Sequence, residues 1–301
     1  MNKNLPEMFP GYDTVEIETA DVRFFCRVGG SGPPLLLLHG YPQSHVIWHT
    51  TAPYLGKDFT LVLPDLPGYG QSSVPPLGGS HEAYSKRNWA RALIEMMQVL
   101  GHERFSVAGH DRGGRVAYRM AMDHPEALER VAVLDILPTA DYWDRLERSF
   151  GLKIYHWMFL AQPAPFPEKF ISACPIRFLE HTLASWTAAR NLDCFSREAL
   201  IHNRDWFCDP DRVAATCEDY RAGATIDYEH DNTDRMAGRK IKTPLLALWG
   251  DKGIAASVED PLAAWANWCE EVAGAALPCG HFLPEEKPVQ TAEALLNFFS
   301  A

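Results

Sequence analysis

The stretch RFSVAGHDRGGRVAYRMAMDHP, residues 104–125, decides how the chain is organised. Its first part contains a short continuous apolar run, which is typical of a strand buried on both faces of a sheet. Helix-like spacing of apolar residues follows at 113–123. Gly109 and Gly113 allow a sharp backbone turn between the two. The stretch therefore predicts a strand–turn–helix unit that exposes Asp111 at the turn.

Similar buried-strand patterns recur along the chain and alternate with helix-like stretches. The strand patterns lie at 33–40, 59–65, 104–111, 130–136 and 244–250, with a weaker one at 272–280. The helix-like stretches lie at 82–100, 113–123, 258–268 and 289–300. Alternating apolar and polar residues at 14–19 and 22–28 predict a β-hairpin at a sheet edge. This order predicts an α/β fold, with a mostly parallel sheet flanked by helices on both faces.

The alternation of strands and helices stops at Pro138 and resumes at about residue 244. The residues between carry aromatic-rich helical stretches, separated by proline-rich loops such as AQPAPFPEK at 161–169. We therefore expect residues 139–235 to form a helical cap, inserted after the sixth strand of a core domain made of residues 1–138 and 236–301. The cap should lie on the carboxyl ends of the strands, where open α/β sheets bind their ligands.

Composition and charge exclude several classes of protein. The 301 residues carry a net charge of −11, which argues against nucleic acid as a partner because phosphate binding needs a basic surface. The seven cysteines are scattered without a CxxC pair, which indicates reduced thiols rather than disulfides or a zinc site. The sequence has no signal-peptide pattern and no apolar run of about 18 residues, so we expect a cytoplasmic protein that does not bind membranes. It has no metal-ligand cluster or phosphate-binding loop either, and no cofactor is predicted.

The turn at Asp111 carries the first candidate catalytic group. An acidic residue between a buried strand and a helix matches a nucleophile elbow, although the same residue could instead only cap the helix. The segment HGYP, 39–42, follows another buried strand at the position where this scaffold builds an oxyanion hole. We expect the backbone N–H groups of Tyr41 and Arg112 to converge there, the alternative being a simple Gly-Pro turn.

A base and an orienting acid complete the expected catalytic set. The segment GHF follows the last weak strand and supplies His281 as general base. Asp135 ends one buried strand and Asp251 follows the next, so both are candidate acids. Many sequences with this arrangement place the acid three residues after the glycine of a Trp-Gly pair. This chain has Gly253 at that position. We therefore expect Asp135 to orient His281.

Four motifs make the chain similar to known enzymes: GHDRGGR at 109–115, KIYHW at 153–157, CEDYRAGA at 217–224 and GHFLPEE at 280–286. They resemble the fluoroacetate dehalogenases of the α/β hydrolase superfamily, and the resemblance covers nearly the whole chain. Haloalkane dehalogenases and epoxide hydrolases share the aspartate but typically have tryptophan after it, where this chain has Arg112. The resemblance implies hydrolysis of fluoroacetate and other small haloacetates to glycolate and halide, and a homodimer.

The resemblance and the side-chain chemistry together assign the expected roles. Asp111 would displace the halide and form an alkyl ester, which water activated by His281 hydrolyses. The guanidinium groups of Arg112 and Arg115 would bind the carboxylate of the small anionic substrate, unless both pair with acidic residues of the protein.

The resemblance also implies a halide site in the cap. His156, Trp157 and Tyr220 would hold the leaving halide through their N–H and O–H groups. Trp186 is expected to line the substrate channel.

Two other functions stay open at this point. An epoxide hydrolase would use the same Asp111 and His281, with Tyr220 and a second phenol, from Tyr142, Tyr155 or Tyr228, protonating the epoxide oxygen. The two arginines argue against it, because an epoxide carries no carboxylate. A scaffold kept only for ligand binding is disfavoured by the intact set of nucleophile, base and acid.

Overall fold

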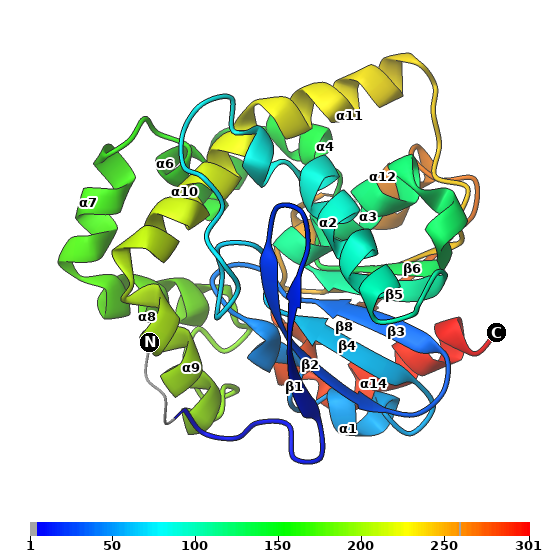
Figure 1. Cartoon of the computed structure of the whole chain (residues 1–301). Coiled ribbons are helices and arrows are strands. Elements are labelled where there is room, and N and C mark those ends of the chain that lie inside the picture. Colours follow the sequence, from blue (N-terminus) through cyan, green and yellow to red (C-terminus); the bar gives the residue numbers. More distant parts are fainter. Residues whose placement is uncertain (1–4, 259) are drawn as a thin grey trace.

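Residues 5–258 and 260–301, which a computed structural model describes, form an eight-stranded sheet surrounded by helices (Figure 1). The strands are β1 (Asp13–Glu18), β2 (Arg23–Gly30), β3 (Pro34–Leu38), β4 (Thr60–Pro64), β5 (Phe105–His110), β6 (Leu128–Leu134), β7 (Leu245–Gly250) and β8 (Val272–Leu277). Their order across the sheet is β1-β2-β4-β3-β5-β6-β7-β8. The pairs β1–β2 and β2–β4 are antiparallel and all later pairs are parallel. The predicted α/β fold, with a mostly parallel sheet and a hairpin at its edge, is confirmed.

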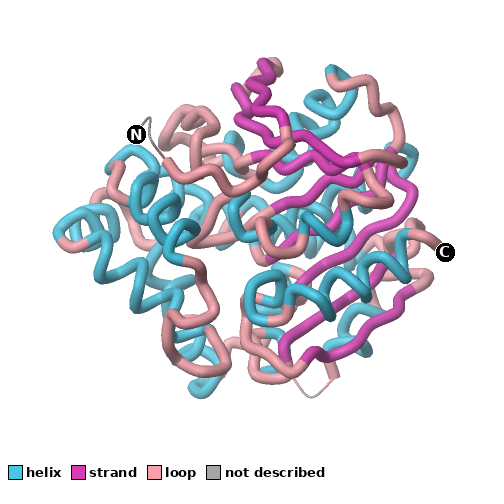
Figure 2. The backbone as a smooth tube through the Cα atoms, turned by 90° about the horizontal axis from the view of Figure 1, so that it is seen from below, coloured by secondary structure: helices cyan, strands magenta, loops and turns pink. Residues whose placement is uncertain are grey.

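The helices of the sheet region cover both faces of the sheet, whose twist is visible in Figure 2. They are α1 (Ala52–Leu55), α2 (Lys86–Val99), α3 (Arg112–Asp123), α12 (Pro261–Ala266), α13 (Leu283–Glu286) and α14 (Pro288–Phe299). Alternate residues of each strand enter opposite halves of the core. Leu36 and Leu38 of β3 join the cluster that includes α2 and α3, while Leu35 and Leu37 join the cluster of α1 and α14. Burial on both faces explains the continuous apolar runs.

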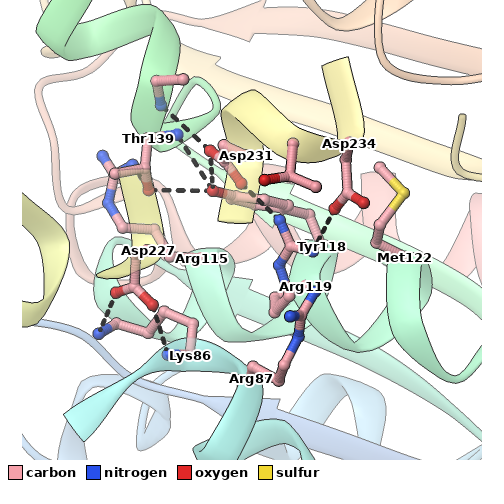
Figure 3. Close-up of polar contacts among 12 residues, drawn as sticks. Lys86, Arg87, Arg115, Tyr118, Arg119, Met122, Thr139, Asp227, Asp231 and Asp234 are labelled. Carbon is pink, nitrogen blue, oxygen red and sulfur yellow. Dashed lines mark hydrogen bonds and ion pairs between the residues drawn. The ribbon is translucent and has the colours of Figure 1, made fainter. Parts of the chain in front are cut away.

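A run of helices fills the sequence between β6 and β7, the stretch expected to form the cap. They are α4 (Thr139–Asp144), α5 (Arg148–Lys153), α6 (Tyr155–Leu160), α7 (Phe166–Ala173), α8 (Pro175–Trp186), α9 (Arg197–Phe207), α10 (Pro210–Ala224) and α11 (Ile226–Met236). Helices α6 to α10 lie to the left of the sheet in Figure 1, and α11 runs back across α3. Arg119 of α3 pairs there with Asp231 and Asp234 of α11 (Figure 3). None of the helices within 5–258 and 260–301 is both long and apolar enough to span a membrane.

Several element boundaries differ from the sequence predictions, for local reasons. The helix expected at 82–100 begins at Lys86, because the Ser85 hydroxyl accepts a hydrogen bond from the Asn88 N–H and caps it there. The strand expected at 130–136 ends at Leu134, because Asp135 takes a φ of +52°. The strand β8 lies at the sheet edge and is half exposed, which explains its weak apolar pattern. All seven cysteines have free thiols.

Candidate active site

Asp111 lies at the tip of the turn between β5 and α3. Its φ of +47° and ψ of −114° form a strained conformation, which persists only where the surroundings enforce it. Gly109 and Gly113 permit the turn, because a Cβ at either position would lie 2.3 Å from a backbone oxygen. The Asp111 side chain makes no capping hydrogen bond to α3. The helix-cap alternative is therefore wrong, and the carboxylate turns toward Tyr41 and His281 instead.

The charge state of Asp111 suits a nucleophile. Burial alone would raise the pKa of its carboxyl, but the neighbouring His281, His110 and the two arginines that follow it outweigh burial and lower that pKa. The carboxyl is therefore ionised at neutral pH, as nucleophilic attack requires.

His281 lies between Asp111 and Asp135. Its Nδ1 is 2.5 Å from Asp135 Oδ2, and its Nε2 is 3.9 Å from Asp111 Oδ2. Nε2 is buried and has no hydrogen-bond partner among the described residues. The contact with Asp135 places the proton of the imidazole on Nδ1, so that Nε2 is left as a base facing the nucleophile. The structure thus brings together the three residues expected to form the catalytic set.

The local backbone explains why Asp135 and not Asp251 reaches His281. The Asp135 carboxylate accepts hydrogen bonds from the N–H groups of Gly250, at 3.2 Å, and Ile254, at 2.8 Å. A Cβ at Gly253 would lie 2.2 Å from Asp135 Oδ1. The glycine at the position of the usual acid thus makes room for the carboxylate that arrives from β6, while Asp251 is exposed.

The two carboxylate oxygens of Asp111 have different neighbours. The backbone N–H of Tyr41 donates to Asp111 Oδ1 at 2.9 Å, whereas Oδ2 faces His281. Arg112 is the first residue of α3, where backbone N–H groups lack partners within the helix. The N–H groups of these two residues are therefore suited to hold negative charge on Oδ1.

Arg112 is fully buried and only partly paired. Its Nε donates to Asp219 Oδ2 at 2.8 Å, and its Nη2 donates to the Asp219 backbone oxygen at 2.8 Å and to Oδ1. Its Nη1 has no hydrogen-bond partner among the described residues. The alternative that Arg112 pairs with an acid of the protein is thus correct for one edge of the guanidinium, while the Nη1 donor remains available to a ligand.

Asp219 belongs to a buried charge network that the sequence analysis missed. Besides Arg112, its carboxylate accepts bonds from Lys86 Nζ at 2.5 Å and from the Tyr69 hydroxyl at 2.7 Å. Lys86 also contacts Asp227 of α11 at 3.1 Å (Figure 3). These cations outweigh burial and lower the pKa of Asp219 to about 2. The one available signal was an acid directly before Tyr220, within the motif CEDYRAGA.

Arg115 has no carboxylate among its hydrogen-bond partners in the part of the chain that the structure describes. Its Nη1 donates to the Leu137 backbone oxygen and to Thr139 Oγ1, both at 3.1 Å, and its buried Nε has no partner among the same residues. The guanidinium carbon lies 4.4 Å from the centre of the Trp157 ring and 4.8 Å from that of Tyr142. Because no described carboxylate forms a hydrogen bond with this buried guanidinium, binding of an anionic ligand would stabilise its charge.

The three expected halide ligands lie together in the cap. The ring of Tyr220 is 5.6 Å from that of His156 and 6.1 Å from that of Trp157. The Tyr220 hydroxyl and His156 Nδ1 are buried and without partners among the described residues. Burial lowers the pKa of His156 to about 3 and raises the pKa of Tyr220 well above its ordinary value, so both side chains are neutral. The Tyr220 hydroxyl can therefore donate to an anion, and neutral His156 can do so in the tautomer that carries its proton on the nitrogen facing the anion, without a fixed ion pair.

Trp186 and the other candidate phenols occupy different surroundings. The ring of Trp186 lies 4.4 Å from that of His156 and 5.3 Å from that of His281, and its role in lining a substrate channel stays a prediction. Tyr142 packs on Arg115, and the Tyr228 hydroxyl donates to Asp144. Tyr155 is partly exposed. Two of these phenols share a neighbour with Tyr220: the Tyr142 ring is 5.2 Å from that of Trp157, and the Tyr155 ring is 6.1 Å from that of His156. Tyr220 also lies 5.3 Å from the ring of Tyr41, whose hydroxyl lacks a partner among the described residues.

Comparison with known proteins places this geometry in a family. The sequence profile described as the alpha/beta hydrolase fold matches residues 33–288. The chain belongs to the alpha/beta hydrolase family. A fluoroacetate dehalogenase of Burkholderia sp is 43% identical over 97% of this hydrolase and 95% of the relative.

Two further relatives show how broad the similarity is. A soluble epoxide hydrolase of Corynebacterium sp. (strain C12) is 32% identical over 90% of this hydrolase and 91% of the relative. A solved structure from Nostoc sp PCC 7120, provisionally named an alpha/beta hydrolase, superposes with a TM-score of 0.93 at 46% identity, over 96% of this chain and 98% of the other. The chain is thus a hydrolase whose relatives carry the names of both a dehalogenase and an epoxide hydrolase.

Proposed function

We propose that this hydrolase cleaves the carbon–halogen bond of fluoroacetate and other small haloacetates, and releases glycolate and halide. The observation that carries the proposal is the pair of buried arginines beside Asp111. Arg112 Nη1 and Arg115 Nε have no hydrogen-bond partner among the described residues, and guanidinium groups recognise carboxylates. The similarity to the Burkholderia fluoroacetate dehalogenase supports the same substrate class.

The first step is a displacement at the substrate methylene carbon. The arginines hold the carboxylate, and Asp111 Oδ2 attacks the carbon from the side opposite to the halogen. The carbon–halogen bond breaks, the halide leaves with the bonding electrons, and an ester joins Asp111 to the CH₂COO⁻ group. His156, Trp157 and Tyr220 donate hydrogen bonds to the departing halide.

The second step hydrolyses this ester at the Asp111 carbonyl carbon. His281 Nε2 takes a proton from water, and the resulting hydroxide adds to the carbonyl. The negative charge develops on Oδ1, where the Tyr41 N–H already donates. Collapse expels the glycolate oxygen, which takes the proton back from His281. Asp111 retains the oxygen atom of the water and releases the second water proton to solvent, which restores its carboxylate. Asp135 stabilises the transient imidazolium.

Epoxide hydrolysis is the alternative function, and one observation favours it. The hydroxyls of Tyr220 and Tyr41 are both buried without partners among the described residues, so two phenols face the region beside Asp111. The same Asp111 and His281 would serve that reaction. The two arginines weigh against it, because an uncharged epoxide would leave Arg112 Nη1 and the Arg115 guanidinium without a carboxylate ligand.

The test is fluoride release from millimolar fluoroacetate, measured with a fluoride electrode beside chloroacetate and an uncharged epoxide. We expect halide release that Asp111→Asn abolishes. Asp251→Asn, which changes the exposed acid outside the catalytic set, should retain turnover. Epoxide opening without halide release would contradict the proposal and support the alternative.

A single turnover in oxygen-18 water tests the site of hydrolysis. Attack at the Asp111 carbonyl predicts that the label appears in the peptide containing Asp111, as read by mass spectrometry. Label found only in glycolate after one turnover would mean that water attacks the substrate carbon directly.

A further inference from the structure

A surface cavity of about 470 Å³ lies directly outside the candidate active site. Its walls come from both parts of the molecule: Lys153 on α5 and Trp186 at the end of α8 belong to the cap, whereas Lys252 and Ile254 follow β7. Lys153 Nζ donates to the Gly253 backbone oxygen at 2.5 Å and to Ser257 Oγ at 2.8 Å, and so joins the two sides.

Two residues that line this cavity are also neighbours of the expected catalytic residues. The Trp186 ring that lines it is 5.3 Å from the His281 ring. The backbone N–H of Ile254, which also lines it, donates to the Asp135 carboxylate. The catalytic side chains themselves are almost wholly buried, with Asp111 5% exposed. A substrate must therefore pass between side chains to reach them. At this cavity, one layer of side chains separates the surface from the catalytic set.

The charge of this cavity is opposite to that of the whole protein. Lys153, Arg190 and Lys252 line it, together with His181, and no aspartate or glutamate is among the lining residues that the structure describes. Acidic residues outnumber lysine and arginine 39 to 28 in the chain. Four other surface cavities each have at least one acidic residue in their lining. The cationic lining is thus a local property of this cavity, and a concave cationic surface raises the local concentration of anions.

We propose that this cavity is an entrance that collects carboxylate anions electrostatically and delivers them past Trp186 to Arg112 and Arg115. The inference rests on the proposed function, because it takes the substrate to be an anion. The lysines and arginine at the mouth attract the anion over several ångströms while the protein as a whole repels it. The two buried arginines then bind it. The entrance residues act on the rate of association rather than on the chemical step.

The experiment measures the association rate constant of fluoroacetate with the Asp111→Asn protein, by stopped-flow tryptophan fluorescence. Lys252→Glu in this background reverses a charge at the mouth, and no hydrogen bond or ion pair of the Lys252 side chain is present in the part of the chain that the structure describes. We expect association to slow about threefold to fivefold at low ionic strength, as for a charge reversal about 10 Å from the path of the anion. The difference should disappear in about 0.5 M salt, which screens charges beyond about 4 Å. Arg190→Gln should act in the same direction with a smaller effect.

Two controls separate charge from structure. Lys57→Glu makes the same change on the loop before β4, at the amino ends of the parallel strands, and should leave association unchanged. The uncharged fluoroacetamide should associate equally fast with all variants. The entrance is refuted if Lys252→Glu leaves fluoroacetate association unchanged at low salt, or slows fluoroacetamide equally. Fluoride release by the unaltered chain, measured in parallel, tests the proposed function separately. Salt-dependent association without fluoride release would refute that function and retain the entrance.

Discussion

Replacing Asp219 with asparagine should impair both stability and substrate binding through Arg112. The carboxylate accepts two side-chain bonds from the guanidinium and further bonds from Lys86 and Tyr69, all in a fully buried setting. Asparagine retains one acceptor oxygen but turns an NH₂ group toward the N–H groups of the cations. Of the two cations, Lys86 would keep its contact with a second acid, Asp227, and Arg112 has no contact with that acid.

The magnitude follows from the burial of the pair. Removing one partner of a buried ion pair costs about 3–5 kcal/mol, and the Asp227 contact of Lys86 favours the lower value. A loss of about 3 kcal/mol lowers the melting temperature by about 5 °C in a chain of 301 residues. Loss of the fixed Nη1 donor removes a charged hydrogen bond to the substrate, worth about 1.5–3 kcal/mol. The corresponding loss in kcat/KM for fluoroacetate is roughly 10- to 100-fold.

Thermal denaturation and fluoride release together test this reasoning. Asp227→Asn is the matched control, because Asp227 contacts Lys86 at the other end of the same network but does not contact Arg112 (Figure 3). We expect the control to lose stability while kcat/KM changes little. If Asp219→Asn and Asp227→Asn reduce kcat/KM equally, the pairing with Asp219 does not position Arg112, and the argument fails.

Three further perturbations test other parts of the site. Gly253→Ala places a Cβ 2.2 Å from Asp135 Oδ1, so halide release should fall at least tenfold as the acid is displaced; unaltered turnover would contradict the role of Asp135. His281→Gln should form the ester on Asp111 but not hydrolyse it, and mass spectrometry after exposure to fluoroacetate should find the modified protein. Burial, opposed by a hydrogen bond from Gln43, raises the pKa of Glu285 to about 8. The protonated form is thus favoured in the folded state, and stability is lost as pH rises toward 8. The melting-temperature advantage of Glu285→Gln over the unaltered protein should therefore grow between pH 5 and pH 8, whereas parallel curves would show that Glu285 does not titrate this way.

The sequence determined the fold class and the position of the candidate nucleophile. Continuous apolar runs report burial on both faces of a strand, and Asp111 with its flanking glycines forms one uninterrupted segment. The sequence also favoured Asp135 over Asp251, because this chain has Gly253 at the position where related sequences carry the orienting acid.

Tertiary structure alone decided how the charged groups are shared. Arg112 was expected to offer an unpaired fork, but Asp219, 107 residues away, takes one edge of it and leaves Nη1. The basic cavity likewise joins Lys153 and Arg190, from the segment between β6 and β7, with Lys252, which follows β7. Local patterns encode burial and turns, because these depend on neighbouring residues. Ion pairs and cavity walls depend instead on how the cap packs against the core, and no spacing along the chain records that contact.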